Sequence, residues 1–176
     1  AQHVLAGREV GGDRHGRAGE GGAVNVREGQ IGLDCRRGSA LGIGDGAGVG
    51  REHGRVVITK HGDLSVLKVE QRPDPPPPGP GQVRITVRAA GVNFADHLAR
   101  VGLYPDAPKT PCVVGYEVAG TIDAVGAGVD GSRVGERVLA GTRFGGYSEI
   151  VNVKAADTVH LPDALTFEQG AAVPVN

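Results

Sequence analysis

The sequence predicts a mainly β fold, a partly open β-barrel with a few short helices, preceded by a glycine-rich tail. Three observations lead to this fold class. From residue 55 onward, short apolar segments alternate with glycine-rich turns, and little of the chain has helical spacing. A run of prolines interrupts the strands once. Before residue 55 the composition changes, since residues 1–54 hold 16 of the 31 glycines and no proline, lysine or aromatic residue.

Residues 1–54 are therefore expected to be a Gly/Arg-rich tail, either disordered or a wrongly extended start, and residues 55–176 to be the folded domain. The tail has little apolar surface to bury and much backbone entropy to lose. Its motif GIGDGA, residues 42–47, matches a loose form of the dinucleotide-binding fingerprint. That fingerprint needs a buried strand before it and a helix after it. Neither flank has that periodicity, so a chance match is favoured.

The composition of the whole chain argues against several classes of partner. A net charge of −1 provides no basic surface for nucleic acid, and no polybasic run points to a membrane surface. No segment approaches the roughly 18 consecutive apolar residues of a transmembrane helix. Cys35 and Cys112 lie far apart without a CxxC motif, so we expect two reduced thiols in a cytoplasmic protein.

The first predicted elements are two short strands, RVVIT (55–59) and LSVLKVE (64–70), joined by the turn KHGD. The proline-rich segment 72–81 is predicted to be a polyproline II connector, because proline cannot donate a hydrogen bond to a sheet. Residues 82–92 then alternate, with Val83, Ile85 and Val87 on one face. This alternation is typical of a half-buried strand.

Later in the chain, four more segments have the character of strands: 112–126, 134–140, 145–153 and the short 159–160. Within the first of them, Gly115 and Gly120 are expected to mark bulges or close backbone approaches.

Two helices complete the prediction. Residues 93–102 have helical spacing in Phe94, Leu98 and Val101, and end on a glycine suited to a C-cap. Near the end, Thr166 and Gln169 form a capping box that begins a second helix.

The polar residues do not predict a metal or nucleophile site. A catalytic zinc needs about three converging protein ligands, whereas the histidines of the folded part are scattered and Cys112 suits a small buried residue. No Ser-His-Asp or Cys-His arrangement has a recognisable spacing. Asn93 and Asp96, three apart at a helix start, have two interpretations: they cap the helix, or they face a polar cleft. On the residues alone, capping is favoured.

Six phrases occur in order over about 120 residues: VVITKHG, VRAAGVNFADHLARVGLY, PCVVGYEVAGTIDAVGAGV, VGERVLA, GGYSEIVNV and LPDALTFEQGAAVPVN. Through them, residues 55–176 resemble the N-terminal, GroES-like domain of medium-chain dehydrogenases/reductases. Among these, the chain is most similar to zinc-independent quinone oxidoreductases, including the zeta-crystallin and vesicle amine transport protein-like branches. The resemblance implies that the barrel is GroES-like.

The resemblance also has a consequence for zinc binding. In zinc-dependent members, the phrase matching GVNFAD carries a cysteine ligand, and the phrase matching GYE carries a histidine ligand. Asn93 and Tyr116 stand there in this chain, and an amide and a phenol cannot replace a thiolate and an imidazole at neutral pH. The resemblance therefore implies no zinc. Glu117 is expected to be a buried carboxylate held by hydrogen bonds or an arginine, and Tyr116 to pack in the core.

The activity implied by the resemblance is NAD(P)H-dependent reduction of a quinone or enone. By residue-to-residue carry-over, Asn93 and Tyr104 are the catalytic donors over the nicotinamide, and Asn93 and Asp96 lie near the cofactor. NADPH would be bound mainly by a Rossmann domain expected after the last helix, so the isolated chain is expected to be inactive. The alternative is a non-catalytic fragment or an interaction module that forms homo-oligomers.

Overall fold

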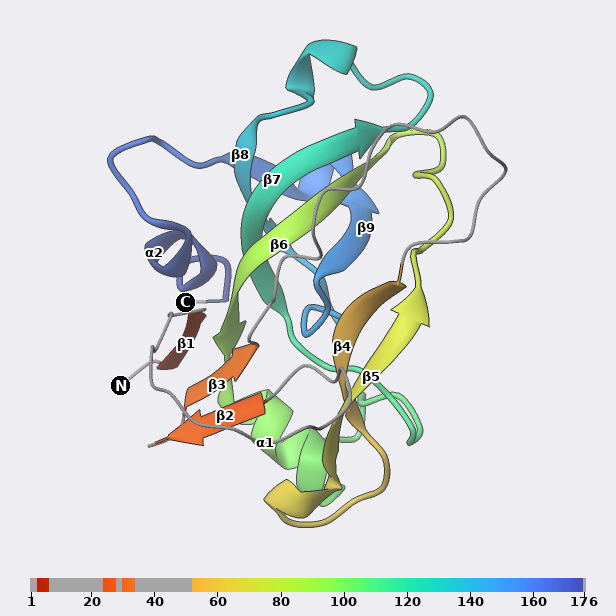
Figure 1. The fold of residues 1–176 in the computed structure, drawn as a ribbon, viewed down its shortest axis with the longest axis vertical. Coiled ribbons are helices and arrows are strands. Elements are labelled where there is room, and N and C mark those ends of the chain that lie inside the picture. Colours follow the sequence, from red (N-terminus) through yellow and green to blue (C-terminus); the bar gives the residue numbers. More distant parts are fainter. Residues whose placement is uncertain (1–2, 7–23, 28–29, 34–51, 176) are drawn as a thin grey trace, which may run out of the picture.

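The computed structural model describes residues 3–6, 24–27, 30–33 and 52–175 (Figure 1). Most of the tail predicted to be disordered, together with the GIGDGA motif and Cys35, lies outside the described residues. Three short strands are described within the tail: β1 (His3–Ala6), β2 (Val24–Arg27) and β3 (Gln30–Leu33). β2 pairs with β3, and β1 pairs with the long strand β6.

The main sheet has six strands in the order β1-β6-β7-β8-β10, with β9 also paired to β6, and every pairing is antiparallel. Its later strands are β6 (Gln82–Val92), β7 (Glu117–Val125), β8 (Arg137–Gly141), β9 (Ile150–Lys154) and β10 (Thr158–His160). β9 pairs with residues 82–86 of β6, and β1 with residues 89–92. The predicted class, a mainly β fold built as a partly open barrel with a few short helices, is confirmed, and the observed sheets are not closed.

A two-stranded sheet of β4 (Glu52–Ile58) and β5 (Leu67–Pro73) is joined by single bridges to the segments that precede β9 and β7. Arg55 bridges to Ser148, and Ile58 to Cys112. β4 begins three residues before the boundary that the composition predicts.

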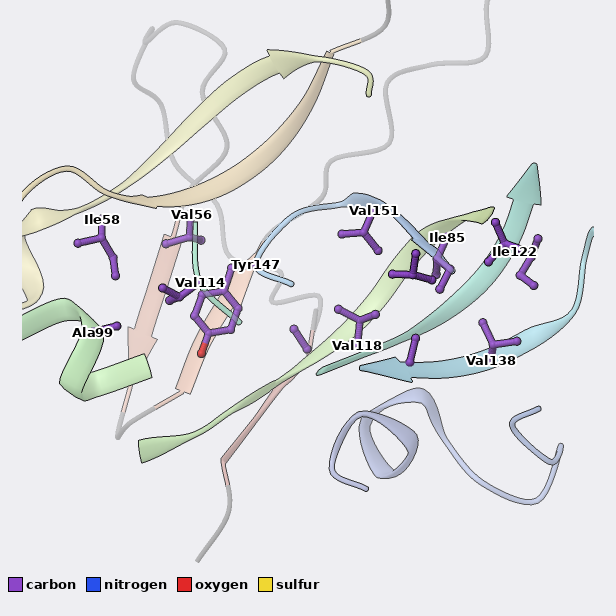
Figure 2. Packing of buried hydrophobic residues seen from close by; sticks show 14 of the residues in the cluster. Val56, Ile58, Ile85, Ala99, Val114, Val118, Ile122, Val138, Tyr147 and Val151 are labelled. Carbon is purple, nitrogen blue, oxygen red and sulfur yellow. The ribbon is translucent and has the colours of Figure 1, made fainter. Parts of the chain in front are cut away.

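The core lies between these sheets and follows the predicted alternation of β6. Val83 and Ile85 are fully buried, and Val87 packs against the same cluster. Figure 2 shows Ile85 beside Val118, Ile122 and Val138. Each such aliphatic side chain contributes about 1.5–3 kcal/mol by leaving water, so this row fixes the register of β6 against its neighbours.

Gly120 confirms the predicted close approach of two backbones. It lies opposite Val87, where the β6–β7 register shifts. A Cβ on Gly120 would stand 2.2 Å from the carbonyl oxygen of Thr86, which belongs to the backbone and has no room to move.

Four predicted strands begin later than expected, β5 and β7 among them. Residues 64–66 form the 3-10 helix η1, because the Asp63 carboxylate accepts a hydrogen bond from the backbone N–H of Ser65. β5 then runs into the predicted proline connector and ends on Pro73, opposite Glu52 at the end of the ladder, where a missing N–H is tolerated. In the segment predicted as strand 112–126, regular pairing starts only at Glu117.

Residues 113–115 instead bond to the loop before β9. Their carbonyl oxygens accept backbone N–H groups from residues 145–147, which explains why β9 is shorter than the predicted strand 145–153. β8 is likewise shorter than predicted, since a 3-10 turn, η2 (Gly131–Arg133), and a following turn occupy the residues before Arg137. A third 3-10 turn, η3 (Ala155–Asp157), joins β9 to β10.

Both predicted helices form. α1 (Phe94–Val101) ends at Gly102, whose φ of 82° is left-handed, as a C-cap glycine should be. The apolar spacing of α1 does not coincide with its buried side: Phe94 is 74% exposed, and the buried residues are Asp96 and Ala99. The helix is rotated this way because its carboxylate, rather than its phenyl ring, finds partners inside the protein.

The second helix, α2 (Phe167–Ala171), has the predicted capping box. The N–H of Gln169 donates to Thr166 Oγ1 at 3.2 Å, and the N–H of Thr166 donates to Gln169 Oε1 at 2.9 Å. Ala171 then packs with Ala89, Ala119 and Leu161 beside β6 and β7. In the described part of the chain, no helix is both long and apolar enough to cross a lipid bilayer.

Candidate functional site

Asn93 and Asp96 meet at the first turn of α1. Asn93 is the N-cap residue, and Asp96 Oδ2 accepts the backbone N–H of Asn93 at 2.9 Å. The side-chain nitrogen of Asn93, Nδ2, donates to Glu117 Oε1 at 2.9 Å. Asn93 and Asp96 therefore form a capping box at the start of α1, and the amide nitrogen of Asn93 also reaches the start of β7.

Asp96 is held inside the protein, 5% exposed. Its other oxygen, Oδ1, accepts the N–H of Gly115 at 2.9 Å. Gly115 has a φ of 101°, and a Cβ there would stand 2.8 Å from the backbone nitrogen of Tyr147, so the close approach predicted at Gly115 is confirmed. This glycine brings the 113–115 segment close enough for its N–H to reach the carboxylate.

Burial raises the pKa of the Asp96 carboxyl above its usual value, although the two backbone hydrogen bonds and the Tyr147 phenol act in the opposite direction. The carboxylate of Glu117 adds to the rise. The Tyr147 hydroxyl is itself buried without a hydrogen bond of good geometry among the described residues. Burial, and then the charge of Asp96, hold the pKa of Tyr147 well above its usual value.

The raised pKa of Asp96 predicts a pH-dependent stability. Above the usual aspartate pKa of 3.8, the folded chain holds the proton more tightly than the unfolded chain, so the contribution of Asp96 to the unfolding free energy falls as pH rises. Asp96→Asn cannot titrate in this window. Urea unfolding of both chains at several pH values should therefore give a wild-type minus variant difference that decreases with pH. A flat or increasing difference would contradict the raised pKa.

Glu117 is fully buried at the first position of β7. Oε1 accepts the Asn93 amide, and Oε2 accepts the backbone N–H of Val175 at 2.9 Å. Gly91 leaves the space that this carboxylate fills, since a Cβ on Gly91 would stand 2.2 Å from Glu117 Oε1. Of the two expected ways of holding Glu117, hydrogen bonds are therefore the one observed among the described residues.

Three aromatic rings form a second part of the site. Tyr104 and Tyr116 meet edge to face with ring centroids 6.1 Å apart, and Tyr116 lies 5.3 Å from Phe144. The Tyr116 hydroxyl is buried without a hydrogen bond of good geometry in the described part of the chain. Burial first, and then the neighbouring Tyr104 phenol, raise the pKa of Tyr116. Tyr116 is a packed neutral phenol at neutral pH, while Tyr104 is only half-buried.

The structure thus joins Asn93 with Asp96 and Tyr104 with Tyr116, in two groups that meet at the adjacent residues Tyr116 and Glu117. Sequence reasoning missed Phe144, Tyr147 and the backbone of Val175. Phe144 and Tyr147 lie in the glycine-rich loop 141–147, and aromatic residues beside such a loop were the only available signal.

The histidines of the described residues 52–175 do not gather at this site. His61 contacts Gly102, His97 lies 3.0 Å from an Arg100 guanidinium nitrogen, and His160 lies 3.4 Å from Glu136. Among the described residues, no group of three or more His, Cys, Asp or Glu side chains could hold a metal ion. The polar atoms that converge at the site are amide, phenol and carboxylate groups.

The sequence and the fold of this chain are similar to those of known proteins. Residues 79–163 match the alcohol dehydrogenase GroES-like domain. The folded part of this chain is such a domain. The sequence-based assignment to the GroES-like domain of the medium-chain dehydrogenases/reductases is thereby confirmed, and the relatives that match this domain include VAT-1 homologs and quinone oxidoreductases, as the sequence indicated.

The synaptic vesicle membrane protein VAT-1 homolog of Rattus norvegicus is 46% identical over 122 residues, which are 69% of this chain and 30% of that protein. The quinone oxidoreductase of Salmonella typhimurium is 42% identical over 120 residues, 67% of this chain and 36% of that protein. The chain therefore spans about a third of the length of these relatives.

Solved structures agree with the assignment. The human VAT-1 homolog-like protein superposes with a TM-score of 0.67 at 34% identity, covering 72% of this chain and 40% of that one. The Escherichia coli quinone oxidoreductase complexed with NADPH superposes with a TM-score of 0.62 at 36% identity, covering 68% of this chain and 36% of that one.

Proposed function

We propose that residues 55–176 are the N-terminal catalytic domain of a zinc-independent, NADPH-dependent quinone or enone oxidoreductase of the cytoplasm. The proposal rests on the position and the hydrogen bonding of Asn93. It occupies a position where zinc-dependent members hold a ligand, and its amide is bound to Glu117 instead. A neutral hydrogen-bond donor thus stands where a metal would otherwise polarise the substrate. The lineage, with quinone oxidoreductases among the relatives, supports this choice of reaction.

A nicotinamide and a carbonyl substrate fit this donor set, because both present neutral polar groups that an amide and a phenol can bond. When bound, the reduced nicotinamide supplies a hydride to the quinone or activated alkene. Negative charge then develops on the carbonyl oxygen, and Asn93 and Tyr104 donate hydrogen bonds to it. Neutral donors suit this task, since they stabilise the charge without needing to be ionised first.

Asp96 contributes indirectly in this proposal. It is 5% exposed and both of its oxygens accept backbone N–H groups, so little of the carboxylate is left within reach of a cofactor. It holds the first turn of α1 against the 113–115 segment, and this positions Asn93 on the side where we place the nicotinamide.

Most of the cofactor's contacts are proposed to lie outside residues 55–176. Phosphates and adenosine are usually bound by a glycine-rich loop at the start of a Rossmann domain, and these groups provide much of the affinity. The relatives are about three times as long as the matched segment, which leaves room for such a domain in them.

This proposal predicts the activity of two polypeptides. Residues 1–176 alone should not oxidise NADPH in the presence of a quinone. A chimera that continues after Asn176 with the cofactor-binding domain of a matched quinone oxidoreductase should oxidise NADPH. It combines the proposed donors, Asn93 and Tyr104, with a domain that binds the cofactor. Steady-state assays with a quinone and an enone test both statements. Turnover by the 176-residue polypeptide, or none by a folded chimera that binds NADPH, would contradict the proposal.

A further inference from the structure

We propose that Glu117 is a positioning residue for this reaction: it fixes which way the Asn93 amide points, and it ties that orientation to the backbone at Val175. The effect of Glu117 on catalysis rests on the proposed function. The orientation of the Asn93 amide depends only on hydrogen bonds within the chain, so the orientation can be right even if the proposed reaction is wrong.

The orientation follows from the chemistry of the two side chains. An asparagine amide donates from nitrogen and accepts at oxygen, whereas a carboxylate only accepts. The contact of 2.9 Å from Asn93 to Glu117 Oε1 therefore needs the nitrogen, and the amide oxygen must face the other way. Nδ2 carries a second hydrogen, which remains for a substrate oxygen. A half-turn of the amide would replace this donor with an acceptor and would repel the developing negative charge.

Glu117 can impose this orientation because its own position is fixed from several sides. The residue begins β7, paired with Gly141, and its side chain has no exposure to solvent. A Cβ on Gly91 would stand 2.2 Å from Oε1, and the Val175 N–H holds Oε2 at 2.9 Å. A rotated carboxylate would lose its hydrogen bonds to two donors, the Asn93 amide and the Val175 N–H, which are only partly shielded from solvent.

The bond to Val175 extends the effect beyond the site. Val175 follows α2, and its N–H shares one carboxylate with the Asn93 amide. A displacement of the backbone at Val175 would therefore change the position of the carboxylate, and with it the donor of Asn93. Glu117 thereby couples the segment after α2 to the position of the reacting oxygen.

Glu117→Gln tests the orientation with little change in size. Glutamine has one acceptor and one donor, so it cannot accept from both Asn93 and Val175. With its oxygen on Val175, its NH₂ faces Asn93, whose amide must turn to present oxygen. In the NADPH-active chimera we expect kcat to fall by at least about tenfold with KM changed less, since a transition-state donor is lost. Glu136→Gln, which removes a carboxylate paired with Arg133, is the control and should keep kcat.

A double variant separates positioning from a purely structural role. Asn93→Asp with Glu117→Gln gives the amide at position 117 a carboxylate that accepts from it without having to turn, but presents no donor to the substrate. We expect the melting temperature lost in Glu117→Gln to be partly recovered in the double variant, while kcat stays low. If kcat recovers together with stability, or if Glu117→Gln leaves kcat unchanged, the positioning role is wrong.

A second readout does not need activity. In the 176-residue chain labelled with ¹⁵N, one side-chain NH₂ proton of Asn93 should be shifted downfield and exchange slowly because it is bound to Glu117, and Glu117→Gln should abolish both features. If they persist in the variant, Glu117 does not orient the amide. If they are lost as expected while the parent chimera reduces no substrate, the proposed reaction fails and the orientation by Glu117 stands.

Discussion

Removing either proposed donor from the chimera should lower kcat by about 10²-fold, the loss typical of one well-placed oxyanion donor. Tyr104→Phe deletes a single hydroxyl and keeps the ring that packs edge to face on Tyr116. Asn93→Ala deletes the amide and also leaves Glu117 Oε1 without its donor. The second change should therefore also lower the melting temperature, whereas the first should barely affect it.

Stopped-flow and steady-state kinetics of these chimeras check the prediction. Lys109→Ala, an exposed change in the loop that follows α1, is the control and should stay within about twofold of the parent, as surface substitutions generally do. If Tyr104→Phe and Asn93→Ala both match the parent in kcat, the two residues shape the cleft without donating to the substrate. A smaller loss in Tyr104→Phe than in Asn93→Ala would mean that solvent can replace the phenol, which is only half-buried.

The largest expected loss of stability is that of Gly120→Ala. The new methyl would meet the Thr86 carbonyl oxygen at 2.2 Å and the Ile85 side chain at 2.8 Å. Because the first contact is with backbone of the central strand pair, relief requires β6 and β7 to separate. We expect a loss of about 3 kcal/mol or more in the free energy of unfolding, at or above the upper end for overpacked sites.

Gly131→Ala is the matched control. A Cβ at Gly131 meets no atom within 4 Å, so the same chemical change should stay within about 0.5 kcal/mol of the parent. Thermal unfolding of the three chains measures the difference, at about 2–4 °C for each kcal/mol in a chain of this size. Equal melting temperatures for Gly120→Ala and Gly131→Ala would mean that the β6–β7 approach is not as close as described.

Features set by neighbouring residues were predictable from the sequence. The alternation of Val83, Ile85 and Val87 placed β6 on the core, and the Thr166 and Gln169 capping box placed the start of α2. In both cases the signal and the structure it specifies lie within a few residues. The 3-10 turn at Leu64 was also within reach, since Asp63 two residues before Ser65 is a local capping signal.

Features set by contacts between distant residues were not predictable in this way. Phe94 begins the apolar spacing of α1 and yet is exposed, whereas Asp96 faces inward to meet the N–H of Gly115, 19 residues away. The site depends on such contacts throughout: Asn93 reaches Glu117 across 24 residues, and Glu117 reaches Val175 across 58. Local spacing favoured a cap at Asn93 over a polar cleft, and the family resemblance favoured the cleft.

Metal-free hydride transfer is tested most directly by a single-turnover measurement on the chimera. The protein is treated with a strong chelator, its zinc content is measured, and excess enzyme with bound NADPH is mixed with a quinone while the nicotinamide absorbance is followed. We predict no stoichiometric zinc and one NADPH oxidised per quinone reduced, at the same rate before and after chelation. About one zinc per chain, with a rate that chelation abolishes and added zinc restores, would contradict a site in which Asn93 and Tyr104 take the place of the metal.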